Sequence, residues 1–262
     1  MENIYNSLKN AFQNLIKENK ENKTLIPFFL LLVTIPFPFA VNNIALGIFI
    51  ISAIINFKKH QGSVTKLLVL PIILYLLMVV SCIWSIDKNE SFKALSKEIP
   101  LLLIPVFFML KKPFTKNQKK SIIEFYSHSM VLLAIFFLVR AVVRYFISND
   151  SRVFFYHGED YVDYGLVPKL LNAIHVSVFV AVAFFHFFSK EKTSFLDKAF
   201  ALILFGFLLL LSSKNIVITV VLLVLIYIFF FSKSGYRMRL RNIIVLGLIV
   251  ALGLSIGKIK QR

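Results

Sequence analysis

The strongest constraint on this chain is a repeated pattern in which apolar runs alternate with short clusters of charged residues. The sequence is 58% apolar, yet it carries 30 Lys and Arg against 13 Asp and Glu. A soluble protein of this length would spread its charges along its helices and strands. A run long enough to cross a bilayer must satisfy its own backbone polar groups, and therefore must be helical. The pattern predicts an all-α, polytopic transmembrane helical bundle.

The apolar runs predict about nine spans. We place them at residues 25–41, 43–57, 67–86, 96–110, 122–147, 170–188, 197–212, 215–231 and 242–257. The first two are short and are joined only by residues 41–43, which predicts a tight hairpin at that point. Pro27, Pro36 and Pro38 predict a kink in the first span, because proline removes a backbone donor.

Basic residues orient the predicted bundle. With a cytoplasmic N-terminus, the inner segments hold about twice as many Lys and Arg as the outer segments, as the positive-inside rule requires. Residues 1–24 are Lys-rich with apolar residues at helical spacing, so we expect an amphipathic cytoplasmic helix on the inner leaflet. Residues 25–262 are the expected transmembrane domain, with a periplasmic loop at 148–169 and a periplasmic C-terminus. The predicted location is the bacterial inner (cytoplasmic) membrane.

The net charge of +17 does not indicate nucleic acid, because the basic residues divide by side and form no continuous stripe. Anchoring to anionic lipid of the bilayer explains them better. The sequence has no phosphate-binding or dinucleotide glycine motif, no HExxH, and no Cys and His cluster at metal-binding spacing. We therefore expect no cofactor and no metal, which argues against an ATP-driven pump or a metalloprotease.

Two arginines lie inside a predicted span. Arg140 and Arg144 are four residues apart, so they share one face near the outer end of that helix. A charge in the hydrocarbon must reach the headgroups, pair internally or line a hydrated site. Arg144 is close enough to the interface to reach the headgroups, whereas Arg140 either pairs internally or faces a hydrated site. No carboxylate falls in the outer half of this span, so an anion is a candidate partner, and guanidinium suits phosphate.

Three further outer positions have both a structural and a functional interpretation. Lys214 is in a short turn before a span, and is either part of a polar turn or a fixed cation beside a helix N-terminus that favours phosphate. His175, at the outer end of span 170–188, is either a hydrogen-bonded structural residue or a catalytic base. His157, near Glu159 and Asp160, is either a solvated loop residue or a second candidate base.

Several short motifs, in order along residues 65–260, resemble the O-antigen ligase family and related O-antigen polymerases. Residues 81–87 (SCIWSID) are similar to the W-S and acidic residue that end the third span in that family, and residues 100–105 (PLLLIP) to its next, proline-bearing helix. Residues 211–214 (LSSK) resemble an L-S-S-R turn, and residues 175–177 (HVS) an H-P-S/T-Y pattern.

This resemblance implies a metal-independent glycan transferase of lipopolysaccharide biosynthesis. Members take a glycan from undecaprenyl pyrophosphate on the periplasmic face and join it to a sugar hydroxyl of the lipid A core or of a growing glycan. Arginines near the outer face hold the pyrophosphate, a role that the resemblance gives to Arg140, Arg144 and Lys214, and a base activates the acceptor, for which His175 is the candidate. Pyrophosphate leaves readily once its charge is stabilised.

Three departures from the family pattern leave alternatives open. Lys214 replaces an Arg, Val176 replaces a Pro, and the family's large periplasmic loop with its catalytic His and second Arg would follow the ninth span, where this sequence ends. We therefore expect an incomplete chain that holds the donor half of the site. The motifs do not separate ligase from polymerase. The alternatives are a transporter of small molecules or lipids and a non-catalytic membrane subunit.

Overall fold

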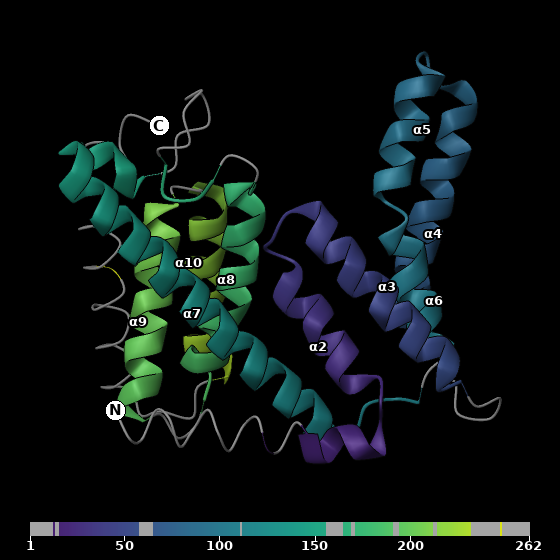
Figure 1. Ribbon diagram of the computed structural model, residues 1–262, viewed down its shortest axis with the longest axis horizontal. Helices are drawn as coiled ribbons and strands as arrows, with labels where there is room; N and C mark the ends of the chain where they lie inside the picture. The colour runs from purple at the N-terminus through teal and green to yellow at the C-terminus, as the bar shows by residue number, and fades with distance from the viewer. Residues whose placement is uncertain are drawn as a thin grey trace. The chain divides into compact units, whose positions relative to one another are not determined.

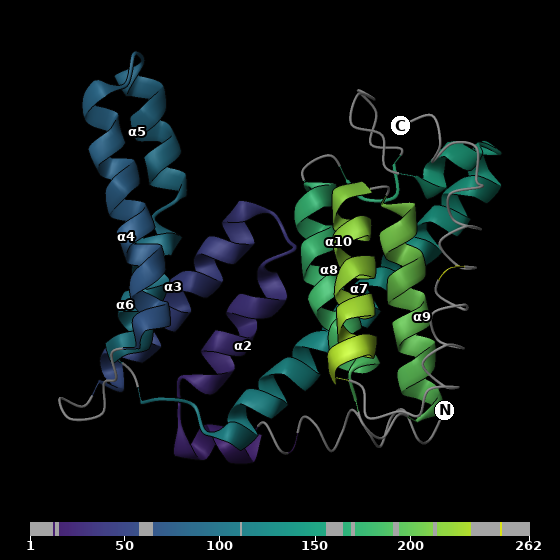
Figure 2. The same cartoon turned by 180° about the vertical axis from the view of Figure 1, so that it is seen from behind.

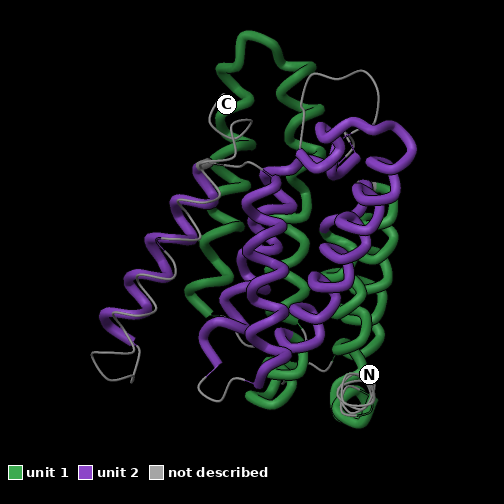
Figure 3. Tube along the Cα trace, turned by 90° about the vertical axis from the view of Figure 1, so that its left-hand side faces the viewer, with its two compact units in different colours: residues 1–35, 39–122 green, residues 36–38, 123–262 purple. Residues whose placement is uncertain are grey.

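The computed structural model describes residues 13, 16–57, 65–110, 112–155, 165–168, 171–190, 194–211, 214–231 and 247, without the side chains of Phe39 and Lys214. Every regular element in this part of the chain is helical, so the predicted all-α class is confirmed for it. The chain divides into two compact units (Figure 3). Unit 1 comprises residues 1–35 and 39–122, and unit 2 comprises residues 36–38 and 123–262.

Besides helical residues 16–21 and the start of α7, the described part of unit 1 contains several α-helices and a short 3-10 helix. They are α2 (Leu25–Thr34), α3 (Phe39–Ile55), α4 (Lys66–Ser81), η1 (Cys82–Trp84), α5 (Lys88–Lys97) and α6 (Pro100–Leu110). Helix α2 packs on α3, and α6 packs on both α3 and α4 (Figure 1). Phe49 is fully buried, and the rings of Phe28 and Phe108 meet at 4.8 Å between centroids. This aromatic packing closes a small core between α2, α3 and α6.

The break between the first two helices differs from the prediction. We expected the hairpin at residues 41–43, but α2 ends at Thr34 and α3 begins at Phe39, with both asparagines inside α3. Pro36 and Pro38 explain the difference, because each lacks a backbone donor and disfavours helical geometry in the residue before it. The Thr34 hydroxyl donates to Asn42 Oδ1 across the break at 3.4 Å.

A second difference is α5, which occupies residues that the sequence places mostly in an outer loop. Asp87 caps this helix, because its side chain accepts a hydrogen bond from the Glu90 amide at 3.0 Å. Glu90 in the first turn and Lys97 in the last turn also complement the helix dipole. Local capping therefore forms a helix where the hydrophobic pattern gives no signal.

Unit 2 is built on residues 123–148 of α7 (Lys116–Ser148), which crosses three further helices (Figures 1 and 2). These are α8 (Ala173–Phe188), α9 (Phe195–Leu210) and α10 (Lys214–Ile226), the last continued by a π-helical turn over Tyr227–Phe231. A short 3-10 helix, η2 (Ser151–Phe154), follows α7. Helix α8 packs on α9 and on α10. Aromatic rings fill the interior: Phe137 stacks on Phe207, and Phe184 packs on Phe205 at a tilt.

Two helices in the described residues are long and apolar enough to cross a membrane, Lys66–Trp84 and Lys116–Ser148. The other apolar helices are shorter, and α2 with 10 residues is only about 15 Å long, half of a hydrocarbon core. The ninth predicted span lies outside the described residues except at position 247. The nine-span bundle and the side on which each terminus lies therefore stay predictions.

The predicted N-terminal segment and outer loop are described only in part. Residues 16–21 are helical, and the amphipathic cytoplasmic segment over residues 1–24 stays a prediction. In the loop at 148–169, the described residues include η2, and the Leu166 amide donates to the Phe155 carbonyl at 3.1 Å.

Candidate functional site

The helices of unit 2 run in alternating directions, and this gathers the predicted site residues at one end. The last part of α7, the first turn of α8 and the first turn of α10 all lie at the end of unit 2 drawn uppermost in Figures 1 and 2. We call this the arginine end and define it as residues 140–148, 173–177 and 214–217.

Arg144 lies on the side of α7 that faces the interior of unit 2, and Arg140 lies at the edge of that side. A buried row follows this helix through Met130, Ala134, Phe137 and Ala141, and the next position in that row is Arg144. Both arginines are half-buried. The rest of the circumference of α7 carries exposed apolar residues, and three of them, Phe136, Val143 and Ile147, share a face with Arg140. The full set is Leu132, Ile135, Phe136, Val139, Val142, Val143, Phe146 and Ile147. Arg144 therefore continues the buried row, whereas Arg140 lies between that row and the exposed apolar residues.

The guanidinium of Arg140 lies 6.0 Å from the centroid of the Phe137 ring. Such a contact is favourable, because the face of an aromatic ring carries negative charge. Arg144 lies one turn further on, and its carbonyl accepts a hydrogen bond from the Ser148 hydroxyl at 2.9 Å. Two cations therefore follow one another along a half-buried side of α7.

Lys214 and His175 lie at the same end but in different settings. Lys214 is the first residue of α10, so its main chain forms part of a helix N-terminus. His175 lies in the first turn of α8, which Asn172 caps by accepting from the Ile174 amide. The His175 side chain is exposed, beside the exposed Ile174. The structure therefore places Arg140 and Arg144 together and leaves the role of His175 a prediction.

The second candidate base, His157, lies outside the described residues together with Glu159 and Asp160. Just before them, Arg152 Nε is paired with Asp150 Oδ2 at 2.7 Å. This pair is partly exposed, and it supplies a natural comparison for the half-buried arginines of α7.

A group of charged residues that the sequence did not predict lies at the opposite end of unit 2. Lys190 Nζ lies 2.8 Å from Asp197 Oδ1 and 4.0 Å from Glu124 Oε1, so one lysine joins α7, the end of α8 and the start of α9. The same ammonium lies 5.2 Å from the centroid of the Phe187 ring. His186 lies one turn before Lys190, and its Nε2 atom is buried without a hydrogen bond within the described part of the chain. We call these residues, with His128, the Lys190 cluster.

Asp197 is in the first turn of α9, before the apolar part of that helix, and closes a capping box with Ser194. Burial raises the pKa of its carboxyl, but the hydrogen bonds from Lys190 and Ser194 outweigh burial and lower the pKa below the usual 3.8. The carboxylate is therefore favoured in the folded protein.

The capping box of Asp197 could have been predicted from the local sequence. A Ser followed three residues later by an acidic residue at a helix start is a capping-box pattern, and residues 194–197 fit it. The contact of Lys190 with Glu124 had no such signal, because it joins residues far apart in the chain. Among the described residues, no three His, Cys, Asp or Glu side chains are grouped so that they could hold a metal ion. The Lys190 cluster is therefore best explained as a structural link between helix ends.

The chain was compared with protein-family models, with curated proteins and with solved structures, and no match was found in any of the three comparisons. The resemblance to the O-antigen ligase family therefore rests on the motifs of the sequence alone.

Proposed function

We propose that this chain is a polytopic inner-membrane protein that binds an undecaprenyl-pyrophosphate-linked glycan at the arginine end. In this proposal it acts as the donor-binding part of an O-antigen ligase-like or polymerase-like transferase. The observation that carries the proposal is the position of Arg140 and Arg144 on the half-buried side of α7, at the end where α10 begins with Lys214.

The chemistry of a pyrophosphate donor fits such a set of cations. Two guanidiniums one turn apart can each donate paired hydrogen bonds to phosphate oxygens. A lysine at a helix N-terminus adds a point charge beside free backbone amides, which also favour phosphate. Charge develops on the pyrophosphate as the glycosidic bond breaks, and cations held in a low-dielectric site stabilise that charge strongly.

The exposed apolar side chains of α4 support the proposed placement in a membrane. Helix α4 exposes large apolar side chains along its length, including Leu67 at 80% and Leu77 at 61%. Exposed apolar area of this extent is unfavourable in water and favourable against lipid tails. The half-buried arginines near the end of α7 would then lie within reach of a lipid-linked donor.

Removing one arginine tests the proposal. In the full chain reconstituted in nanodiscs, Arg140→Ala should weaken binding of undecaprenyl pyrophosphate about tenfold or more, since a hydrogen bond to a charged group contributes roughly 1.5–3 kcal/mol. Arg140→Lys should recover only part of the affinity, because an ammonium lacks the bidentate geometry. Binding is measured by microscale thermophoresis.

Arg152→Ala is the matched control, because it removes one arginine that is largely exposed and paired with Asp150. It should leave the donor affinity unchanged. Equal affinities for the parent chain, Arg140→Ala and Arg144→Ala would refute donor binding at the arginine end.

A transporter of small molecules or lipids is the second candidate, and the interrupted helices favour it. Residues 35–38 separate α2 from α3, and α10 ends in a π-helical turn. Transporters often bind their substrates where helices are interrupted. A chain with no measurable donor affinity in the experiment above would favour this candidate.

A further inference from the structure

Two basic segments almost one hundred residues apart meet in unit 1. The Asn22 side-chain amide donates to the Lys112 carbonyl at 3.2 Å, and the Gln118 amide donates to the Glu18 carbonyl at 3.3 Å. Asn22 and Gln118 are 5% and 1% exposed. These buried amides hold the N-terminal helix against the start of α7.

Each segment also has internal hydrogen bonds that fix its conformation. Thr115 and Gln118 form reciprocal bonds between side chain and backbone at the start of α7, which is a capping-box arrangement. In the other segment, the Thr24 hydroxyl donates to Asn22 Oδ1 at 2.6 Å. Phe114, which is 9% exposed, packs against Phe28 and anchors the junction from the apolar side. The junction is therefore an ordered part of unit 1.

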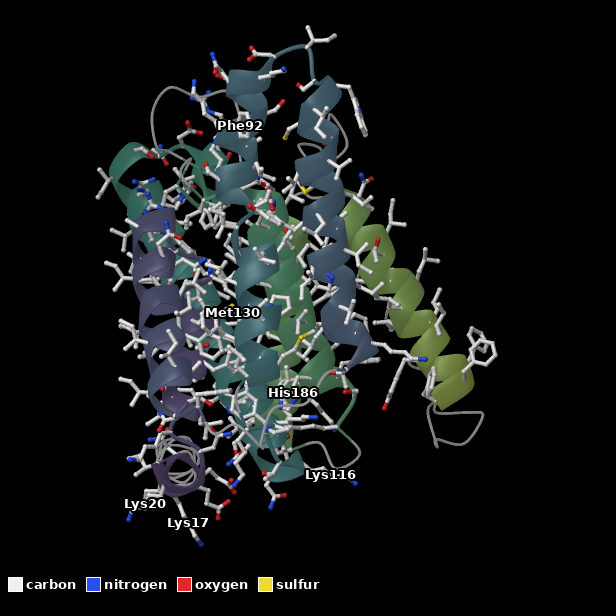
Figure 4. The ribbon with its side chains drawn as sticks, turned by 90° about the vertical axis from the view of Figure 1, so that its right-hand side faces the viewer. Lys17, Lys20, Phe92, Lys116, Met130 and His186 are labelled. Carbon is white, nitrogen blue, oxygen red and sulfur yellow. The ribbon has the colours of Figure 1, made fainter. Side chains whose placement is uncertain are left out.

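The solvent-exposed surface of this junction is strongly basic. Residues 16–24 and 112–120 carry seven lysines against two glutamates, and all seven lysines are exposed: Lys17, Lys20, Lys23, Lys112, Lys116, Lys119 and Lys120. We call this surface the lysine collar. Figure 4 shows Lys17, Lys20 and Lys116 at one end of unit 1, and Phe92 of α5 at the other.

We propose that the lysine collar is a binding surface for the headgroups of anionic phospholipids in the inner leaflet. The surface lies beside apolar helices that suit hydrocarbon, and its cations come from two segments that the buried amides hold together. An ammonium is a compact, strongly hydrated charge that suits the phosphate of a lipid headgroup at the bilayer surface. The proposal rests on the membrane placement proposed above, but not on glycan transfer.

Charge removal tests this surface against a matched control. The triple variant Lys17→Gln, Lys20→Gln, Lys116→Gln is compared with Lys88→Gln, Lys93→Gln, Lys97→Gln, which removes the same charge from the exposed lysines of α5 at the other end of unit 1. Delipidated full chain in detergent is titrated with phosphatidylglycerol and with phosphatidylcholine, and bound lipid is counted by native mass spectrometry. Folding of each variant is checked by its thermal unfolding midpoint.

The collar variant should lose affinity for phosphatidylglycerol by at least about fivefold. This lower limit is the contribution of a single lysine near an anionic surface, roughly 1 kcal/mol, and the variant removes three. The control should stay within about twofold of the parent chain, as should phosphatidylcholine binding in every variant. Equal losses in both triple variants, or no loss in the collar variant, would overturn the proposal.

Two further variants separate this proposal from the others. Gln118→Ala keeps every lysine but removes one buried link, so it should also reduce phosphatidylglycerol binding; unchanged binding would contradict a surface that needs both segments together. Arg140→Ala should leave phosphatidylglycerol binding intact, while the collar variant should leave undecaprenyl pyrophosphate binding intact. If each variant instead weakened binding of both ligands, one anion site would serve both of them. The proposal of a separate lipid surface would then be wrong.

Discussion

The guanidinium of Arg140 lies over the Phe137 ring, on a helix whose other side is covered with exposed apolar residues. An arginine on that other side would face lipid tails and would have to extend towards the headgroups. Arg140 and Arg144 are both half-buried and lie one turn apart along α7. The half-buried positions of these two side chains are the observation on which the proposed donor site depends.

Asp197 provides a prediction at the residue scale. Its carboxylate contacts Lys190 at 2.8 Å, so Asp197→Asn should lower the stability of the chain in detergent by roughly 1 kcal/mol, near the upper end for partly exposed pairs. The unfolding midpoint should fall by about 2–4 °C at neutral pH. Glu124→Gln should have a smaller effect, because Glu124 is 4.0 Å from the same ammonium.

The pH dependence of this difference has a defined sign. Because the pKa of Asp197 is lowered in the folded protein, the ionised carboxyl stabilises the fold above the usual value of 3.8, and this contribution is lost as the pH falls through the lower folded pKa. The midpoints of the parent chain and Asp197→Asn should therefore differ at pH 6 and converge in strong acid. A difference that grows on acidification would show that the Lys190 contact is not the cause.

At the scale of the elements, apolar runs located α7, α8, α9 and α10 to within a few residues at most of their ends. Helix α5 was missed because its sequence, KNESFKALSK, is polar and its formation depends on a cap. The turn between α2 and α3 was misplaced because two adjacent asparagines suggest a turn, whereas Pro36 and Pro38 determine it. The Lys190 cluster could not be predicted, because its members come from three helices whose packing is not encoded in local spacing.

The cap of α5 gives a prediction at this scale. Asp87→Ala removes the acceptor for the Glu90 amide, which should weaken the helix by about 1 kcal/mol. Amide hydrogen exchange over residues 88–92 should then be about fivefold faster, since 1 kcal/mol corresponds to about that factor. Asp87→Asn retains a capping oxygen and should exchange close to the parent rate. Unchanged exchange in Asp87→Ala would mean that the cap does not determine the helix.

At the scale of the whole molecule, the exposed apolar faces and the ends of unit 2 support one proposed placement. The arginine end would lie at the periplasmic surface, and the Lys190 cluster at the cytoplasmic surface. The proposed donor site faces the periplasm only if this assignment is correct.

Labelling of single cysteines in intact cells tests that assignment most directly. In a Cys82→Ser background, Ser148→Cys marks the arginine end and Lys198→Cys marks the end that holds Asp197; both positions are exposed. A membrane-impermeant maleimide should label Ser148→Cys in intact cells and Lys198→Cys only after the membrane is opened. Labelling of both positions in intact cells, or of Lys198→Cys alone, would contradict a bundle that presents Arg140 and Arg144 to a donor on the periplasmic face.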